Sequence, residues 1–275
     1  MSRVAKVLVP TALIAGSAMF IIPFLSTIST SMKTEVEMAQ DPTGFIPHHP
    51  TLDNYAGAWN ALPFATFLQN TLFITTLATF GALASASLVA YGFARFKFRS
   101  RNFLFYAMLA TMMLPYQVTM IPHFLIWRHF GAIDTFFPLI LPAFLGGGAF
   151  NIFLLRQFFL TIPTELDEAM LLDGAGYFGI WWRLILPLSK PALATILVFS
   201  FMGNWDNFES SLIYLNSPRN YTLSLGLRLF QDSNGSNFGQ LMAGSVLHML
   251  PMIVMFLFCQ RYFIKGIATS GLGGR

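Results

Sequence analysis

The chain has 275 residues, of which 55% are hydrophobic and 10% are charged, and its mean hydropathy is +0.61. Soluble domains carry about 25% charged residues, so this composition excludes an ordinary soluble domain and indicates an integral membrane protein. The formal charge of +4 does not point to nucleic-acid binding, because most basic residues flank apolar runs. The single Cys259 allows neither an internal disulfide bond nor a cysteine-rich metal site.

Six segments are long and apolar enough to cross the roughly 30 Å hydrocarbon core, which needs about 20 residues of helix. They are 7–30, 66–93, 103–127, 136–159, 190–214 and 239–263. The first follows a basic N-terminus, but its apolar run exceeds the roughly 7–15 residues of a signal peptide, so we interpret it as an uncleaved membrane helix. The sequence therefore predicts an all-α membrane protein with six transmembrane helices in a single domain, 1–275.

The basic residues predict the orientation of these helices. With the N-terminus in the cytoplasm, twelve of the sixteen Lys and Arg residues fall on the cytoplasmic side, as the positive-inside rule expects. Both termini are then cytoplasmic. The segments 33–65 and 216–238 become external loops, the first of them structured or partly structured. Residues 160–189 form a cytoplasmic loop.

Small residues predict where helices pack closely. Ala82, Ala86, Ala90 and Ala94 recur every four residues, which makes a flat stripe that another helix can approach. Gly146–Gly148 give the fourth helix a second point of close contact or bending. For both features we expect helix packing rather than ligand binding.

The cytoplasmic loop carries an acidic segment, "TELDEAMLLDGAG" (164–176). It predicts a short helix with Thr164 as N-cap, an acidic first turn that the helix dipole favours, and a left-handed stop at Gly174. A second short helix, roughly 177–186, ends at Pro187. Interfacial helices usually present Lys and Arg to the bilayer, so an acidic helix here favours a protein partner over an amphipathic connector lying on lipid.

Polar residues interrupt the fifth predicted helix at "GNWDNFESSL". Polar groups inside a membrane segment face a water-filled path or the protein interior. Two interpretations remain open for them, a translocation pathway or binding-protein interface on one side and structural contacts to a partner helix on the other. The candidate pathway or interface residues are Asn204, Trp205, Asp206, Asn207 and Glu209.

The sequence contains no recognisable motif for energy conversion or catalysis. The chain lacks a G-x-x-x-x-G-K-[ST] phosphate loop, since none of its five lysines follows a glycine. Its five histidines have no trustworthy metal-ligand spacing, and no Ser–His–Asp or paired-carboxylate arrangement appears. We therefore expect a subunit without catalysis, cofactor or metal of its own, in which any ATP and Mg²⁺ are bound by a partner.

The acidic segment resembles the EAA loop of binding-protein-dependent ABC importer permeases. That pattern is E-A-A, three residues, G, nine residues, then I-x-L-P. The chain matches it from "EAM" through "DG" to "LILP", with Met and Leu as mild substitutions. The resemblance extends along nearly the whole chain, through "VAYGFARFKFRSRN", "LPLSKPALAT" and "QRYFIKG". These stretches resemble the carbohydrate branch of that family, and the chain is similar to its maltose-type second permease subunit.

The resemblance implies a six-helix type I importer (MetI-like) permease fold in a bacterial or archaeal cytoplasmic membrane. It implies that the loop is a coupling helix, docked on a separate cytoplasmic ATPase. The matching residues are Glu168, Ala169, Met170, Asp173, Gly174, Leu186 and Pro187. It further implies a second homologous permease, two ATPase copies, an extracellular sugar-binding protein and a sugar substrate.

Two other functions stay open at this point. One is a secondary carrier coupled to ions through Asp206 and Glu209, which would work without ATP. The other is an accessory membrane protein without a pathway.

Overall fold

The computed structural model describes residues 3–232 and 238–272. The described residues form helices joined by loops, with no β-strand among them, so the predicted all-α class is confirmed. The chain divides into two compact units, Met1–Thr66 with Leu223–Pro251 and Phe67–Thr222 with Met252–Arg275. We call them the first and second unit and describe each by itself.

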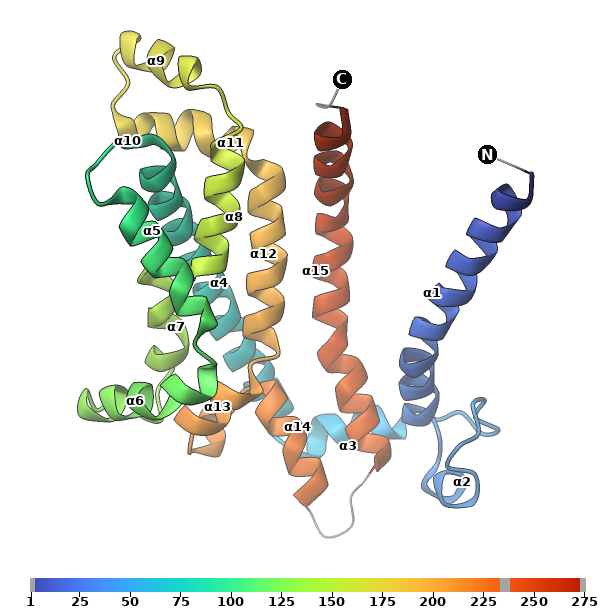
Figure 1. The fold of residues 1–275 in the computed structure, drawn as a ribbon. Helices are drawn as coiled ribbons and strands as arrows, with labels where there is room; N and C mark the ends of the chain where they lie inside the picture. The colour runs from blue at the N-terminus through green and yellow to red at the C-terminus, as the bar shows by residue number, and fades with distance from the viewer. Residues whose placement is uncertain (1–2, 233–237, 273–275) are drawn as a thin grey trace. The chain divides into compact units, whose positions relative to one another are not determined.

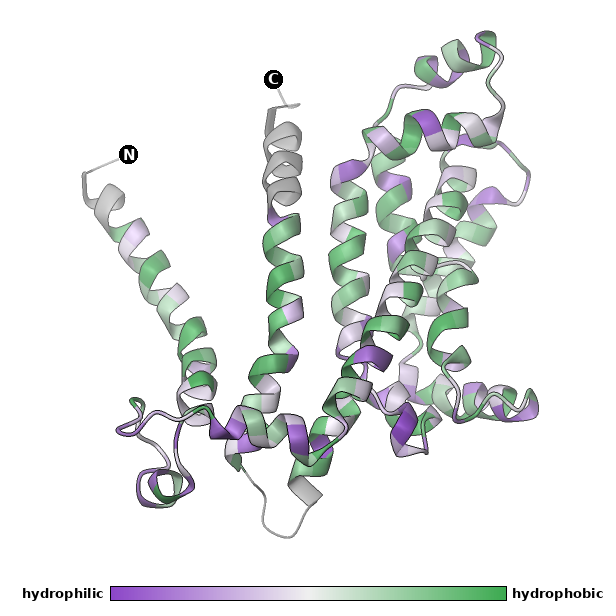
Figure 2. Cartoon of the chain, turned by 180° about the vertical axis from the view of Figure 1, so that it is seen from behind, coloured by the Kyte–Doolittle hydropathy of each residue, from purple (hydrophilic) through white to green (hydrophobic). Residues whose placement is uncertain are grey.

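Four helical segments of the described chain are long and apolar enough to cross a membrane: Leu8–Ser31, Phe64–Arg95, Phe137–Phe159 and Phe238–Gln260. Two bent pairs, Arg101–Met113 with Tyr116–His129 and Tyr177–Leu188 with Lys190–Trp205, raise the number to six if each pair is one span. Hydropathy agrees, since apolar residues line these helices and polar residues gather at their ends (Figure 2).

The first unit contains α1 (Arg3–Ser31), α2 (Glu35–Gln40), α3 (Asp53–Ala61), α14 (Leu223–Asp232) and the beginning of α15 (Phe238–Leu272). The predicted external loop 33–65 is folded, because it contains both α2 and α3. Its polar groups are satisfied internally: Lys33 is fully buried and its Nζ donates to the carbonyl of Asp41 at 2.8 Å. The Nδ2 of Asn54 donates to the carbonyls of Ser31 and Lys33.

Helix α1 keeps its large apolar side chains on the surface of the chain. Ile14 is 71% exposed and Phe20 is 78% exposed. Such a surface cannot face water, so it requires lipid or another protein around it. The helix is therefore consistent with the predicted first membrane span.

The second unit is a bundle built mainly from α4 (Phe64–Arg95), α5 (Arg101–Ala110), α8 (Ala149–Phe159) and α12 (Lys190–Trp205) (Figure 1). At one end lies the predicted cytoplasmic loop, with α9 (Thr164–Leu172), α10 (Tyr177–Ile180), the π-helix Trp181–Ile185 and α11 (Leu186–Leu188). At the opposite end lie α6 (Tyr116–His129) and α13 (Phe208–Tyr214). We call these the α9 end and the α13 end.

The core of this bundle lies under the α9 end. Its buried side chains come from α4, α8, the loop between α8 and α9, the α10–π-helix stretch and α12: Ala86, Ala90, Tyr91, Ala94, Ile152, Leu155, Phe159, Ile162, Ile180, Trp181, Ile185, Ala192 and Ile196. The predicted stripe of alanines on α4 thus faces other helices. Its packing role is confirmed.

Close approach at Gly147 explains the break between α7 (Phe137–Phe144) and α8. A Cβ on Gly147 would lie 2.4 Å from the carbonyl oxygen of Ala82 and 2.8 Å from the Cβ of Ala86, and its φ is +70°. Only glycine fits such a position without strain. Ser85 Oγ also donates to the carbonyl of Ala143 at 2.7 Å, which ties α4 to the same break.

Two predicted spans are not straight helices. The segment 103–127 turns by 102° between α5 and α6, where Leu114 and Pro115 are extended. Proline disfavours helical backbone at the residue before it, and here that effect ends one helix and starts another. The segment 190–214 is helical only to Trp205, after which α13 begins at Phe208.

Candidate functional site

The α9 segment, defined as residues 160–189, carries the predicted coupling residues. Helix α9 covers Thr164–Leu172, as the acidic pattern predicts. The predicted capping is wrong, because Pro163 occupies the N-cap position and no side chain caps the helix. Thr164 is instead the first helical residue, and Asp167 points to another element.

The predicted stop at Gly174 is confirmed. Gly174 has φ +82°, and its N–H donates to the carbonyl of Leu171 at 3.0 Å, while the N–H of Ala175 donates to the carbonyl of Met170 at 2.9 Å. This pair of bonds is a Schellman motif. Met170 and Ala175, the two residues that the second bond joins, both pack against the core.

The second short helix extends further than predicted. It runs from Tyr177 to Leu188, and Pro187 lies within its last turn rather than after it. The π-helical stretch Trp181–Ile185 widens the backbone ladder, with the N–H of Leu186 bonded to the carbonyl of Trp181. Single π-helical turns of this kind are frequent at functional sites.

A buried ion pair fixes α9 to the bundle. Arg95, the last residue of α4, places Nε 2.6 Å from Oδ2 of Asp167, and the two side chains are 6% and 13% exposed. The same guanidinium donates to the carbonyl of Ile162 at 3.0 Å. Burial raises the pKa of Asp167, and the charge of Arg95 offsets that only in part. The position of α9 is therefore tied to the end of α4.

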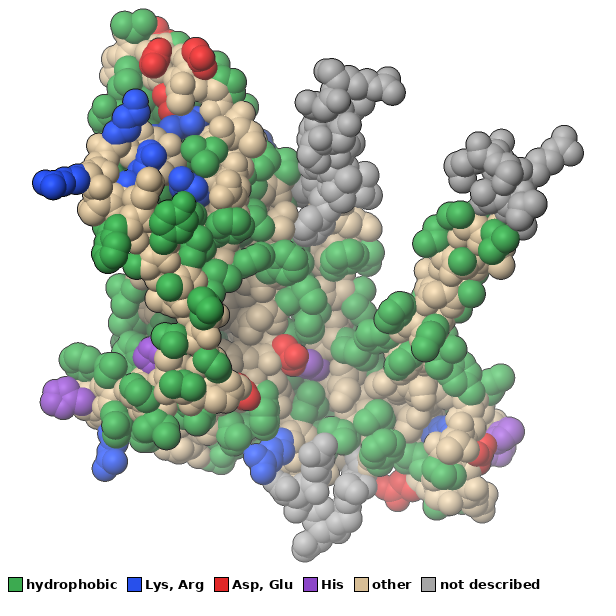
Figure 3. Space-filling model, in the orientation of Figure 1, with side chains coloured by type: hydrophobic (Ala, Val, Ile, Leu, Met, Phe, Trp, Pro, Cys, Tyr) green, Lys and Arg blue, Asp and Glu red, His purple; other side chains and the backbone are tan. Residues whose placement is uncertain are grey.

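The remaining predicted coupling residues lie mostly on the surface. Glu168, Ala169, Asp173 and Pro187 are exposed, whereas Leu186 is half-buried. Acidic side chains gather on α9, and Lys and Arg side chains lie next to them (Figure 3). Between the two groups, Tyr91, Lys97, Glu168, Leu171 and Tyr177 are among the residues that line a cavity of about 730 Å³. This end of the unit thus has a charged, hollowed surface.

The polar residues near the end of α12 separate into two groups. Trp205 is fully buried and stacks on Phe201 at 5.5 Å between ring centroids, so it belongs to the packed interior. Asp206 is exposed at the C-cap of α12, and Glu209 is exposed in the first turn of α13.

Asn204 and Asn207 line a second cavity of about 450 Å³, which we call the α13 cavity. Its other walls come from α6, α7 and α13: Tyr116, His123, Ile126, Trp127, Pro138, Leu139, Pro142, Ala143, Leu145, Ser210 and Tyr214. Asn207 also caps α13, since its Oδ1 accepts the N–H of Ser210 at 3.2 Å. The sequence did not single out the residues of α6 and α7, because their position beside α12 and α13 depends on tertiary packing.

Asp134 is a structural residue that the sequence analysis missed. It lies between α6 and α7 with φ +61°, a conformation that Asp tolerates better than most residues. Its carboxylate accepts the N–H groups of Asn216 and Ser217, both at 2.9 Å, and the hydroxyl of Ser217. Partial burial favours a higher pKa, but these hydrogen bonds prevail and hold the pKa of Asp134 below its ordinary value.

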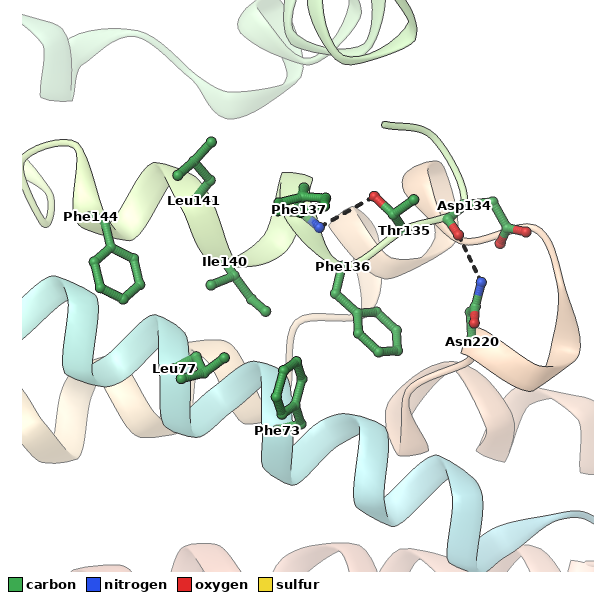
Figure 4. Close-up of a pocket in the computed structure, with 10 residues that line it drawn as sticks. All are labelled: Phe73, Leu77, Asp134, Thr135, Phe136, Phe137, Ile140, Leu141, Phe144 and Asn220. Carbon is green, nitrogen blue, oxygen red and sulfur yellow. Dashed lines mark hydrogen bonds between the residues drawn. The ribbon is translucent and has the colours of Figure 1, made fainter. Parts of the chain in front are cut away.

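An apolar hollow of about 660 Å³ lies beside Asp134 (Figure 4). Phe73 and Leu77 of α4 face Phe136, Ile140 and Phe144 across it. Such a lining suits lipid chains or a neighbouring helix, not a polar solute. Within the described part of the chain, no three His, Cys, Asp or Glu side chains gather closely enough to hold a metal ion.

Comparison with known proteins identifies the family to which this chain belongs. Residues 79–269 match the model of a family described as the binding-protein-dependent transport system inner membrane component. The chain belongs to this family. The permease is therefore a multi-pass membrane protein, and both the α9 segment and the α13 cavity lie within the matched region.

Among relatives, the permease is 33% identical over 266 residues to the arabinooligosaccharides transport system permease protein AraQ of Halalkalibacterium halodurans, which covers 96% of this chain and 94% of the relative. It is 30% identical over 266 residues to the sn-glycerol-3-phosphate transport system permease protein UgpE of Yersinia enterocolitica, with 94% of each chain covered.

Solved structures show the same fold. The permease matches a chain of a bacterial ABC transporter involved in the import of the acidic polysaccharide alginate, with a TM-score of 0.84, 25% identity and 96% and 99% of the two chains covered. A second match, at a TM-score of 0.65 and 16% identity over 93% and 94% of the two chains, is to the alginate transporter in complex with its pentasaccharide-bound periplasmic protein. The predicted permease fold is confirmed.

Proposed function

We propose that the permease is one of two membrane subunits of an ATP-driven, binding-protein-dependent sugar importer. The family and the sugar-transport names of its relatives support import. The neighbour's complex with a periplasmic protein supports an extracellular binding protein as a partner. In this proposal a homologous permease completes the pathway, and both termini lie in the cytoplasm with the α9 end.

The observation that carries the coupling proposal is the construction of the α9 segment. Helix α9 is anchored from behind by the pair between Arg95 and Asp167, while Glu168 faces outward. A cytoplasmic ATPase would bind the outward face and supply ATP, Mg²⁺ and hydrolysis, for which the permease has no phosphate loop of its own. A displaced α9 would then move α4 with it, which shifts the balance between inward-open and outward-open states.

The test is uptake by proteoliposomes that contain the complete transporter, with ATP inside and the binding protein outside. Its probe is an oligosaccharide that stabilises the binding protein in a thermal-shift screen. Glu168→Gln is expected to lower uptake and sugar-stimulated ATP hydrolysis about tenfold or more, because a charge-assisted contact is lost. The affinity of the binding protein for sugar should not change.

Glu165→Gln is the matched control, since it removes the same charge from an exposed position on the same helix. Equal effects of the two variants would show that only net charge matters and would refute the assigned role of Glu168. Uptake without nucleotide that follows an ion gradient would instead favour a carrier using Asp206 and Glu209. An accessory protein would leave uptake unchanged when the permease is omitted.

A further inference from the structure

The α13 cavity has the composition of a site for a hydroxyl-rich ligand. Its volume of about 450 Å³ lies in the usual range for small-molecule sites, about 300–1,000 Å³. Apolar walls from α6 and α7 surround a few polar groups from α12 and α13, namely Asn204, Asn207 and Ser210. Such a pattern of apolar surface with few oriented polar groups is typical of ligand pockets.

The polar groups of the cavity retain hydrogen-bonding capacity. The Nδ2 of Asn204 donates to the carbonyl of Ser200 at 2.7 Å, which leaves its Oδ1 as an acceptor. Asn207 accepts at Oδ1 from Ser210, which leaves its Nδ2 as a donor. The hydroxyls of Tyr116 and Ser210 lie 3.2 Å apart and can each donate or accept. Mixed donors and acceptors match the hydroxyl groups of a sugar.

The lining of the α13 cavity offers no Lys or Arg to an anionic ligand. His123 supplies its only imidazole. Arg128 follows Trp127 on α6, but one residue turns it about 100° around the helix and out of the lining. Asp206 and Glu209 are carboxylates on the surface next to the lining residues. Carboxylate and phosphate ligands are instead recognised by Arg and Lys.

We propose that the α13 cavity is a subsite for an uncharged saccharide and that it discriminates against uronates and phosphorylated polyols. This inference rests on the proposed function as a sugar importer. It separates the permease from its structural neighbour, whose importer takes an acidic polysaccharide, and from the relative named for glycerol 3-phosphate. An unpaired anion in this cavity would lose hydration without gaining a cationic partner.

The experiment measures direct binding to the purified complete transporter in nanodiscs without the binding protein, so that the selectivity of the latter plays no part. Saturation-transfer NMR at pH 8 compares maltotriose with tri-galacturonate. Maltotriose is expected to bind at least about tenfold more tightly. Tyr116→Phe removes one hydroxyl and should weaken maltotriose binding about fivefold, as expected for one lost hydrogen bond.

Two variants test the polar groups and the charge. Asn207→Asp keeps the oxygen that caps α13 and removes the donor, so it should weaken maltotriose binding and exclude tri-galacturonate further. Ser210→Lys adds a cation and should raise the affinity for tri-galacturonate. Asn102→Ala, at the α9 end, is the control and should bind both probes as the wild type does.

Equal or tighter binding of tri-galacturonate, binding of neither probe, or wild-type binding by the cavity variants would overturn the subsite. ATP-driven uptake is measured in parallel. If uptake needs ATP while the cavity variants change nothing, the subsite is wrong and the proposed function stands. If uptake proceeds without nucleotide, the proposed function itself fails.

Discussion

The pair between Arg95 and Asp167 gives the sharpest prediction for the α9 segment. Asp167→Ala removes the carboxylate partner of Arg95, whose side chain is 6% exposed in the wild type, and leaves the carbonyl of Ile162 as an acceptor for the guanidinium. Removing one partner of a buried pair costs about 3–5 kcal/mol. We take the lower end, about 3 kcal/mol, because that carbonyl remains.

This loss is local, so it should appear as opening of α9. Each 1.4 kcal/mol is a factor of ten in an equilibrium constant, so about 3 kcal/mol raises the amide exchange of residues 164–172 about a hundredfold. Hydrogen–deuterium exchange of the permease in nanodiscs measures this directly. Glu168→Ala is the control, since this exposed carboxylate lies on the same helix, and it should change exchange less than about threefold.

The double variant Arg95→Met, Asp167→Leu tests the mechanism. Burial raises the pKa of Asp167 despite the nearby charge, so desolvation offsets much of the attraction, and the pair positions α9 more than it stabilises it. The double variant should therefore recover most of the protection of the α9 amides from exchange.

The same burial predicts how α9 responds to pH. Because the pKa of Asp167 is raised in the folded state, its protonation as the pH falls toward that pKa stabilises the folded site. Mild acidification should therefore not loosen α9. An Asp167→Ala variant exchanging within about threefold of the wild type, or a double variant as loose as the single one, would refute this reasoning.

Three further predictions concern the rest of the second unit. Gly147→Ala should lower the thermal unfolding midpoint far more than Gly174→Ala. Both variants add left-handed backbone strain of roughly 1–2 kcal/mol, but only the new Cβ at 147 would clash with Ala82 and Ala86. Equal losses would contradict the close packing described at Gly147. The lowered pKa of Asp134 stabilises the fold above the ordinary Asp value of about 4, and this stability is lost as the pH falls below it. As the pH falls, the thermal unfolding midpoint of the wild type should thus approach that of Asp134→Asn. Midpoints of the two proteins that change in parallel with pH would contradict this role of Asp134. Trp205→Leu should lower thermal stability while leaving the KM for sugar unchanged, since the indole is buried. A raised KM with unchanged stability would instead indicate that Trp205 lines the translocation pathway.

Local sequence signals were enough to predict helix α9 and its C-terminal end. Its helix follows from an acidic first turn, and its end follows from Gly174, because a Schellman motif depends on neighbouring residues alone. The alanine stripe of α4 could also be predicted from the sequence, because its four-residue spacing depends on one helix alone.

Tertiary contacts explain what the sequence did not reveal. The acidic first turn of α9 was explained by the helix dipole alone, but Asp167 within it pairs with Arg95 on another helix. Trp205 was grouped with its polar neighbours, although packing on Phe201 buries it. The segment 103–127 was predicted as one span, whereas Pro115 precedes α6 and the chain bends by 102° there.

Crosslinking from the tip of α9 tests the central claim most directly. Leu172 is 90% exposed, and Cys259 is the only cysteine of the chain, so Leu172→Cys in a Cys259→Ala background carries one reactive thiol. With a short thiol-to-amine crosslinker in native membranes, the account predicts one dominant adduct with an ATPase subunit, sensitive to added ATP. Adducts with phospholipid alone would contradict it.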